Sequence, residues 1–287
     1  MDLLTLLQTI LDGLMISLFY VLIALGLTLM FGILRVFNFA HGEVYMMGGF
    51  VTYYLFSQFH INYFLTIIAC LIVGAFLGFL FERFIFRPFR DRPFNGFIAS
   101  LGVMWILQTI AITQFGVLDK KVPTVFPGII KAMGISISAE RLGAMIIGIV
   151  MVIGMYLVIN HTKPGKALRA VAQDMEAASL QGIPVNRMTT LAFALGSALA
   201  AGAGAIMSPI FLINPYSGGM PITKAFIVII LGGMGSLPGT ILGGLVLGLL
   251  EAFTAVKLSI GMVSALGFGV VIILLLVKPK GLLGRGE

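Results

Sequence analysis

Five stretches of this sequence carry no charged residue over a length that matches the thickness of a lipid bilayer. At about 1.5 Å per residue, a helix of roughly 20 residues crosses the hydrocarbon of a membrane. Two further tracts, 188–223 and 225–250, are uncharged over more than one crossing needs, and 44–59 is marginal. We therefore expect a multi-pass membrane protein. The five clear runs are 14–34, 61–81, 96–118, 142–159 and 258–277.

Composition favours a bundle of membrane helices and excludes an ordinary soluble domain. The chain has 287 residues, of which 59% are hydrophobic and only 10% are charged. Lipid offers backbone groups no hydrogen-bond partner, so membrane-crossing segments are either helices or closed barrels. The alternating pattern and aromatic girdles of a barrel are absent from the sequence. We predict an all-α polytopic membrane protein, a single transmembrane domain over 1–287, with about eight or nine transmembrane helices.

No catalytic, nucleotide-binding or metal-binding motif stands out in the sequence. The three histidines, His41, His60 and His161, are far apart, and no paired carboxylates share a predicted helix face. Lys166 follows a glycine, but the alanine after it and the missing upstream glycine exclude a P-loop. The single cysteine, Cys70, lies in an apolar run. We predict no enzyme, no cofactor, no metal and no nucleic-acid partner, and we assign the net charge of +7 to loops at the membrane surface.

The basic residues predict which side of the membrane each loop faces. Segments 83–92, 162–187 and 278–285 together hold 11 lysines and arginines, whereas 119–141, 214–224 and 255–259 hold 6. Cytoplasmic loops are enriched in these residues. The first set is therefore predicted to be cytoplasmic, which places the C-terminus inside the cell. With about nine crossings, the N-terminus would lie outside.

The first interruption of an apolar run is RVFNFAHGE, residues 35–43. It crowds Arg35, Asn38, His41 and Glu43 beside an uncharged run. Ionisable side chains at membrane depth are costly and usually functional. We expect the last three to form a polar interruption at the inner mouth of a pathway, and Arg35 to reach the cytoplasmic headgroups. Glu43 is expected to accept hydrogen bonds from the interrupted backbone or from His41.

The second interruption is IILGGMGSLPGT, residues 229–240. Its glycines and its proline cannot continue a regular helix without freeing backbone groups. Broken hydrophobic segments in both halves of a membrane protein point to a transport pathway. The alternative for each stretch is a tight turn between two crossings, with polar side chains at the headgroup level. The candidate pathway or gating residues are Asn38, His41, Glu43, Gly232, Gly233, Gly235 and Pro238.

The segment KPGKALRAVAQDMEAASLQGIPVNRM, residues 163–188, is polar enough to lie outside the bilayer and is patterned as a helix. Pro164 suits a helix start, and Gly182 with Pro184 suits its end. We predict one amphipathic helix of about four turns at the cytoplasmic face. A helix lying flat on the membrane would need bulkier apolar residues, so docking into a groove on a partner is favoured. The predicted docking face is Leu168, Val171, Ala172, Met175, Ser179 and Gly182.

Small residues recur every four positions in two later segments. Such ladders let helix backbones approach closely in a membrane, where no hydrophobic drive between helices exists. They predict a tightly packed bundle and carry no information about its function. The ladders are Ala192, Gly196, Ala200, Gly204 and Ser208 in one segment, and Gly235, Gly239, Gly243, Gly244 and Gly248 in the other.

Three separated motifs resemble those of one family of transport proteins. EAASLQG, residues 176–182, is similar to the EAA-x-x-x-G core of the coupling loops of ABC transporter permeases. NFAHGE in the first interruption resembles the N-terminal signature of the permeases for branched-chain amino acids. LGGMGSLPGTILGG resembles their glycine-rich C-terminal signature. The Ile-x-Leu-Pro ending of the wider ABC consensus is missing after Gly182, which leaves the geometry of the coupling helix open.

The resemblance implies a permease subunit of the LivH kind in a binding-protein-dependent ABC importer. The implied partners are a second homologous permease subunit forming a heterodimer, two cytoplasmic ABC ATPase subunits, and a periplasmic or extracellular substrate-binding protein. The implied location is the bacterial or archaeal cytoplasmic (inner) membrane. ATP hydrolysis would then reside in the partners. The ATPase-coupling residues that the resemblance implies are Arg169, Glu176, Ala177, Ala178 and Gly182.

Two questions stay open at the level of sequence. Permeases of this family for branched-chain amino acids, urea and short amides look alike, so the substrate is not fixed. The rival class is a proton-coupled carrier, which needs titratable groups deep in the membrane. Its candidates are His41, Glu43, Glu82 and Glu251. Glu82 adjoins Arg83 at a predicted helix end and is expected at the interface, and Glu251 is expected near the outer interface, so this class is disfavoured.

Overall fold

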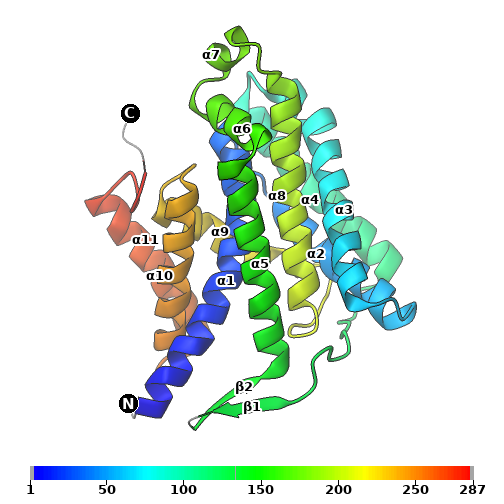
Figure 1. The fold of residues 1–287 in the computed structure, drawn as a ribbon, viewed down its shortest axis with the longest axis vertical. Coiled ribbons are helices and arrows are strands. Elements are labelled where there is room, and N and C mark those ends of the chain that lie inside the picture. Colours follow the sequence, from blue (N-terminus) through cyan, green and yellow to red (C-terminus); the bar gives the residue numbers. More distant parts are fainter. Residues whose placement is uncertain (1–2, 133, 285–287) are drawn as a thin grey trace.

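The computed structural model describes residues 3–132 and 134–284 (Figure 1). Its helices are α1 Leu3–Leu34, α2 Ala40–Thr52, α3 Tyr63–Phe81, α4 Pro93–Phe115, α5 Ala139–His161, α6 Lys163–Gln173, α7 Met175–Leu180, α8 Val185–Met207, α9 Gly219–Gly232, α10 Leu237–Ala255 and α11 Ile260–Val277. Two π-helical segments, η1 Tyr53–Gln58 and η2 Glu82–Phe86, extend α2 and α3, and a 3-10 turn, η3 Arg87–Phe89, follows η2. Two short strands, β1 Ile129–Ala132 and β2 Ile135–Ser138, complete the described chain.

The helices are long enough and apolar enough for a polytopic membrane protein. Within the described residues, six helices can each cross a bilayer by length and hydropathy, and α9 and α11 are shorter apolar segments. The continuous helix of α2 and η1 adds a ninth segment. α1 begins at the end of the molecule that carries the β-hairpin, and α11 runs towards the end that carries α6 and α7 (Figure 1). The all-α polytopic prediction is confirmed.

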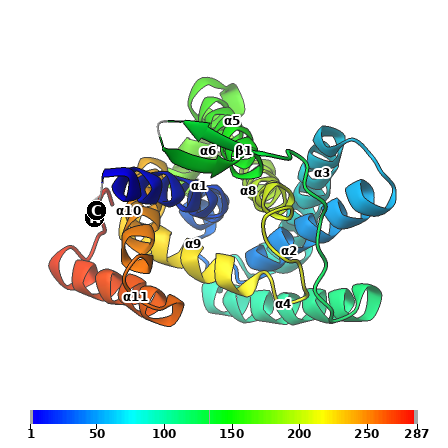
Figure 2. The ribbon, with the colours of Figure 1, turned by 90° about the horizontal axis from the view of Figure 1, so that it is seen from below.

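The centre of the bundle is formed by α1 and α8. The most apolar window of each of these two helices is 72% buried, whereas the corresponding windows of α4 and α5 are 22% buried. Seen along the bundle, α1 and α8 lie between α5 on one side and α2 and α9 on the other (Figure 2). Every element discussed below is therefore positioned by contact with one of these two helices or with their immediate neighbours.

Small residues let these central helices pack with their backbones almost touching. A Cβ atom on Gly26 of α1 would lie 2.4 Å from the carbonyl oxygen of Gly196 in α8. A Cβ on Gly204 would lie 2.0 Å from the carbonyl oxygen of Tyr45 in α2. These approaches exclude any side chain at either glycine. The tight packing predicted from the small-residue ladders is confirmed.

Large apolar side chains project outwards from α3, α4 and α5. Phe76, Trp105 and Ile146 are 58%, 64% and 55% exposed, one on each of these helices. A soluble protein rarely exposes apolar surface on this scale, whereas lipid tails solvate it well. The outer layer of the bundle therefore has the surface of a membrane-embedded protein.

A structured loop with a β-hairpin lies at the end of the bundle where α1 begins (Figure 1). The carboxylate of Glu140 accepts hydrogen bonds from the backbone N–H groups of Val125, at 2.8 Å, and Phe126, at 3.0 Å. Arg141 forms an ion pair with Asp12 of α1, with 3.0 Å between nitrogen and oxygen. The all-α prediction did not include the hairpin, because its strands have only four residues each, too few for a reliable signal.

Candidate functional site

The first interruption is a break between α1 and α2 at residues 35–39. Directly after α1, Arg35 adopts a φ of +52°, which leaves the right-handed helical region and turns the chain. His41 and Glu43 already belong to α2. Asn38, His41 and Glu43 are 0%, 0% and 1% exposed. The tight-turn alternative placed these side chains at the headgroups, whereas the structure places them inside the protein.

The polar side chains of the first interruption contact other helices and not each other. His41 Nε2 lies 3.2 Å from the carbonyl oxygen of Ile23 in α1. The Glu43 carboxylate accepts a hydrogen bond of 2.9 Å from the side-chain amide of Gln108 in α4. The expectation that Glu43 binds His41 or the broken backbone is wrong. Both residues lie in one regular helix, where positions two apart point about 200° apart, so they cannot meet.

The same three residues retain unused hydrogen-bonding capacity. Within the described residues, Asn38 Oδ1, His41 Nδ1 and Glu43 Oε2 are buried and have no hydrogen-bond partner. The amide nitrogen of Asn38 makes only a weak contact of 3.5 Å with the sulfur of Met30. A buried polar atom without a partner is unfavourable, and each such atom in a native structure calls for an explanation. Three such atoms thus lie within six residues at the first interruption.

The second interruption is a tight turn between α9 and α10. Gly233 and Gly235 adopt φ values of +104° and +80°, a region that other residues rarely enter. Ser236 caps α10 by accepting a hydrogen bond of 3.2 Å from the N–H of Gly239, and Pro238 lies in the first turn. Gly232 packs so closely on α10 that a Cβ there would lie 2.2 Å from the oxygen of Gly239. This geometry fits the tight-turn alternative that the sequence left open.

The C-terminal tail closes over the end of α9. The N–H of Leu282 donates to the oxygen of Leu231 at 2.9 Å, and the N–H of Leu283 donates to the oxygen of Gly232 at 3.0 Å. These bonds satisfy two of the carbonyls that a helix end otherwise leaves unpaired. The tail is thereby fixed at the second interruption.

The last turns of α1, just before the first interruption, lie close to the turn of the second interruption, and α6 lies against both. A Cβ on Gly32, near the end of α1, would lie 3.7 Å from the Cα of Gly235. A small, mostly apolar cavity separates these turns from α6. The described residues that line it are Thr28, Leu29, Gly32, Ile33, Ile159, Leu168, Arg169, Ala172, Gly235 and Leu237. A displacement of α6 would therefore act on the last turns of α1 and on the turn of the second interruption.

The cytoplasmic segment predicted as one helix consists of two, α6 and α7. The break is at Asp174, whose extended backbone ends α6. Its carboxylate then caps α7 by accepting hydrogen bonds of 2.9 Å from the N–H groups of Glu176 and Ala177. An Asp at an N-cap satisfies N–H groups that would otherwise be unpaired. The single four-turn helix of the sequence prediction is therefore wrong, because this cap favours a new helix start.

The predicted docking face is largely occupied by the protein's own bundle. Leu168 and Val171 of α6 are 2% and 1% exposed, and Ala178 of α7 is 5% exposed. Two members of that face, Ser179 and Gly182, are exposed, together with residues that lie outside it. Arg169, Glu176 and Ala177 are exposed, Leu180 is 81% exposed, and Gly182 is exposed with a φ of +77°. α7 protrudes from the end of the bundle (Figure 1).

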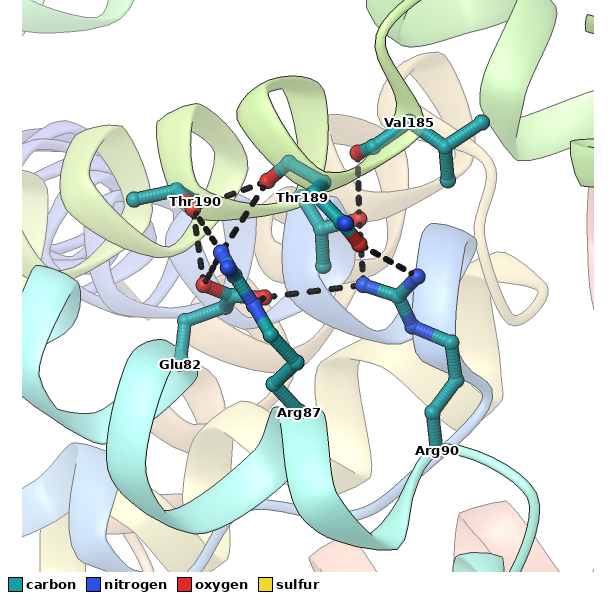
Figure 3. A network of polar contacts seen from close by, with 7 residues as sticks. Glu82, Arg87, Arg90, Val185, Thr189 and Thr190 are labelled. Atoms are coloured by element: carbon teal, nitrogen blue, oxygen red, sulfur yellow. Dashed lines mark hydrogen bonds and ion pairs between the residues drawn. The ribbon is translucent and has the colours of Figure 1, made fainter. Parts of the chain in front are cut away.

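A cluster that we call the polar joint ties the end of α3 to the start of α8 (Figure 3). Glu82, which the sequence placed at the membrane interface, is 0% exposed and forms an ion pair with Arg87 at 2.6 Å. Its burial against α8 was not predicted, because Thr190 lies 108 positions further along the chain, and its depth at the membrane interface stays a prediction. The polar joint comprises Glu82, Arg87, Arg90, Asn186, Thr189 and Thr190.

A second buried ion pair joins α9 to α10. Lys224 and Glu251 are 2% and 6% exposed and bind each other, and the hydroxyl of Tyr20 in α1 donates to Glu251 at 2.6 Å. The sequence analysis assigned Lys224 to an outer loop, which is wrong, because Lys224 lies within α9. The position of Glu251 near the outer interface stays a prediction. The signal that could have revealed the pair is that each charge stands alone within an apolar tract.

The described structure defines a class of protein: a multi-pass helical membrane protein with two interrupted segments and a protruding helix pair at one end. The chain belongs to the family of branched-chain amino acid transport system permease components, whose model matches residues 9–279. The class and family that the motifs suggested are confirmed.

Individual relatives show the same match over nearly the whole chain. The high-affinity branched-chain amino acid transport system permease protein LivH of Escherichia coli K12 is 35% identical over 98% of this chain and 96% of its own length. BraD, the corresponding protein of Pseudomonas aeruginosa, is 33% identical with the same coverage. The fructose import permease protein FruG of Bifidobacterium longum is 27% identical over 67% of this chain and 59% of its own length. No solved structure matches the chain.

Proposed function

We propose that this chain is one of two homologous permease subunits of an ABC importer for branched-chain amino acids. The observation that carries the proposal is the similarity over 98% of the chain to permeases named for these substrates. The fructose permease matches a smaller share at lower identity. In the proposed assembly, two ABC ATPases hydrolyse ATP, and a substrate-binding protein delivers the amino acid to the outer face.

In this proposal α7 and the turn after it form the contact with an ATPase subunit. Leu180 and Ala177 offer exposed apolar surface, and Gly182 has open space around it. Glu176 and Arg169 add charges at the rim. An exposed leucine on a short protruding helix suits insertion into a groove on a partner. Ala178 supports the contact from behind, because it is buried against the bundle.

The proposed orientation places α6, α7 and the C-terminus in the cytoplasm. The basic segments 83–92 and 162–187 flank the helix ends at the end of the molecule that carries α7 (Figure 1). The correction of Lys224 strengthens the asymmetry, because one of the 6 outer cations belongs instead to a buried ion pair. The β-hairpin would then face outwards, where the binding protein docks.

The interrupted segments form the proposed gate. Asn38, His41 and Glu43 supply polar groups in the bundle interior, and the turn that contains Gly233 and Gly235 lies beside the end of α1 and against α6. Gly232 and Pro238 shape the same turn, through close helix contact and the first turn of α10 respectively. A movement of α6 imposed by the ATPase would change both segments together, which is what alternating access requires.

The substrate is tested by reconstituting the complete assembly in proteoliposomes with ATP inside the lumen on the ATPase side. We expect uptake of labelled leucine that unlabelled isoleucine and valine compete away, and that urea and acetamide leave unchanged. Competition by urea or acetamide alone would assign the transporter to the amide-transporting members. Uptake that needs a proton gradient and no ATP would overturn the ABC proposal.

The ATPase contact is tested separately with Leu180→Arg. We expect this variant to insert normally and to lose co-purification of the ATPase subunits, because a charge replaces the exposed leucine. The control is Lys166→Glu, a change of charge on the exposed face of α6. Leu157→Arg would be unsuitable, since that residue faces lipid. Retention of the ATPases by the Leu180→Arg variant would show that they bind elsewhere.

A further inference from the structure

The polar joint lies where the coupling segment returns to the membrane. After α7 the chain makes a four-residue turn, 181–184, before α8 begins. The N–H of Ile183 donates back to the oxygen of Ala178 at 3.1 Å, which keeps this turn tight. A movement of α7 is therefore passed directly to the first turns of α8, and Thr189 and Thr190 lie in those turns.

Within the polar joint, the carboxylate of Glu82 accepts hydrogen bonds from three donor groups. Arg87 binds Glu82 with two nitrogens, Nε at 3.0 Å and Nη2 at 2.6 Å. The hydroxyl of Thr190 lies 2.7 Å from Glu82 Oε2 and 2.8 Å from Arg87 Nη2, so it bridges both charged groups. Two-pronged arginine–carboxylate pairs are the geometrically most specific ion pairs in proteins. The start of α8 is thus held to the end of α3 in a single relative position (Figure 3).

A second arginine, Arg90, also joins this segment to α8. Arg90 donates to the side-chain oxygen of Asn186 at 2.9 Å and to Thr189 Oγ1 at 3.4 Å, and it lies 3.6 Å from Glu82. Both arginines come from the segment between α3 and α4, and both reach α8. That segment therefore cannot move independently of α8 while the joint is intact.

The helix that carries the joint is locally deformable. α3 ends in the π-helical segment η2, and the 3-10 turn η3 leads on to α4. Short π-helical and 3-10 segments have weaker backbone hydrogen bonding than an α-helix and often mark hinges and functional sites. Meanwhile α4 carries Gln108, the hydrogen-bond donor to Glu43 in the first interruption. The joint thus connects the coupling segment to the helix that contacts the buried carboxylate.

The geometry points to a mechanical role for the polar joint: Glu82, Arg87 and Thr190 are positioning residues that make the α3–α4 segment follow α8 when an ATPase moves α7. This inference rests on the proposed docking of an ATPase at α7. Burial of Glu82 without its three donors would be strongly unfavourable, so the hydrogen bonds of the joint persist as α8 moves. The backbone of η2 and η3 then changes conformation instead.

The test uses the complete assembly in proteoliposomes and measures leucine transported per ATP hydrolysed. We expect Glu82→Gln and Thr190→Val each to lower this ratio about tenfold, because each removes a bond to a charged group. Arg87→Lys keeps the charge and should restore part of the ratio relative to Arg87→Met. Arg83→Met is the matched control in the same segment, since Arg83 is exposed and lies outside the joint, and it should leave the ratio unchanged.

Docking is monitored in the same preparations by a cross-link from Leu180→Cys to the ATPase. The native Cys70 is buried and does not compete for the cross-linker. We expect the cross-link to form equally with and without the joint variants. A normal ratio in Glu82→Gln and Thr190→Val, or a proportional fall of transport and hydrolysis together, would overturn the inference. Absence of the cross-link in the chain that carries only Leu180→Cys would instead overturn the docking proposal, and with it the proposed mechanical role of the joint.

Discussion

At the scale of single residues, buried polar side chains of this bundle fall into two groups with different chemistry. Lys224 and Glu251 are paired with each other, and Glu82 is paired with Arg87. By contrast, Glu43 has only a neutral amide as its partner, and its second oxygen has none among the described residues. Paired charges hold helices together, whereas a carboxylate with spare capacity can exchange partners when the helices move.

The first prediction concerns this carboxylate. Glu43→Gln keeps an oxygen that can accept from Gln108, so uptake should fall modestly. Glu43→Leu leaves the half-buried Gln108 amide without this acceptor and removes the polar group from the bundle interior, so uptake should fall much further. The measurement is the initial uptake rate per inserted protein, for leucine, isoleucine and valine. Equal and full activity of both variants would show that Glu43 has no role in gating, and loss for one substrate alone would make it a recognition residue.

The second prediction concerns the buried pair. Lys224→Met or Glu251→Gln alone removes one charge and strands the other, which typically costs about 3–5 kcal/mol when the pair is buried. The double variant removes both charges and should be more stable than either single variant. Thermal unfolding of the purified protein in detergent, followed by loss of its helical signal, measures this order. A double variant that is as unstable as the sum of the single changes would show that the two residues act independently.

At the scale of elements, the interior is defined by helices that approach at glycines. The contact between Gly204 of α8 and Tyr45 of α2 places one backbone directly on another, and a Cβ at Gly204 would lie 2.0 Å from the carbonyl oxygen of Tyr45. Backbone cannot yield as a flexible side chain can. Helix α5, on the outside of the bundle, carries Gly154 with nothing within 4 Å of its Cβ position.

These two glycines give the third prediction. Gly204→Ala forces α8 and α2 apart and should destabilise the fold by about 1–3 kcal/mol, the usual penalty for overpacking. Gly154→Ala adds a methyl group to open space and should be neutral or stabilise by up to about 1 kcal/mol, because alanine is the better helix former. The midpoints of thermal unfolding in detergent compare the two. Similar midpoints would show that the bundle relaxes at the α8–α2 contact.

The cytoplasmic elements show where sequence patterns lose their predictive power. The apolar positions of 163–188 have helical spacing, and the structure does place Leu168 and Val171 on one face. The pattern cannot tell whether that face meets a partner or the protein's own bundle, since both require the same residues. Nor does it register Asp174, whose side-chain cap overrides the continuity of the helix.

At the scale of the whole molecule, the charge-free runs, the polar cluster at 35–43 and the glycine-rich break at 229–240 were enough to predict the bundle and both interruptions. Their lengths follow from the physics of the bilayer, which acts on each segment separately. The polar joint and the Lys224–Glu251 pair could not be predicted in this way. Glu82 and Thr190 are 108 positions apart, and only the packing of α3 on α8 brings them together. Long-range pairing of this kind is a property of the assembled bundle.

The last prediction concerns the orientation of the whole bundle in the membrane. The described chain has one cysteine, Cys70, which is buried, so an introduced cysteine can be labelled selectively. Lys121→Cys lies in the exposed loop between α4 and the β-hairpin, and Lys280→Cys lies in the exposed C-terminal tail. The proposed orientation places 11 of the lysines and arginines in cytoplasmic segments, and it places the loop with Lys121 outside. A membrane-impermeant maleimide should therefore label Lys121→Cys in intact spheroplasts. It should label Lys280→Cys only after the membrane is opened, because the tail is then on the inner side. The unmodified chain, which should stay unlabelled in both conditions, is the control. The reverse pattern would invert the bundle, and it would place α7 on the side of the membrane where no ATPase can reach it.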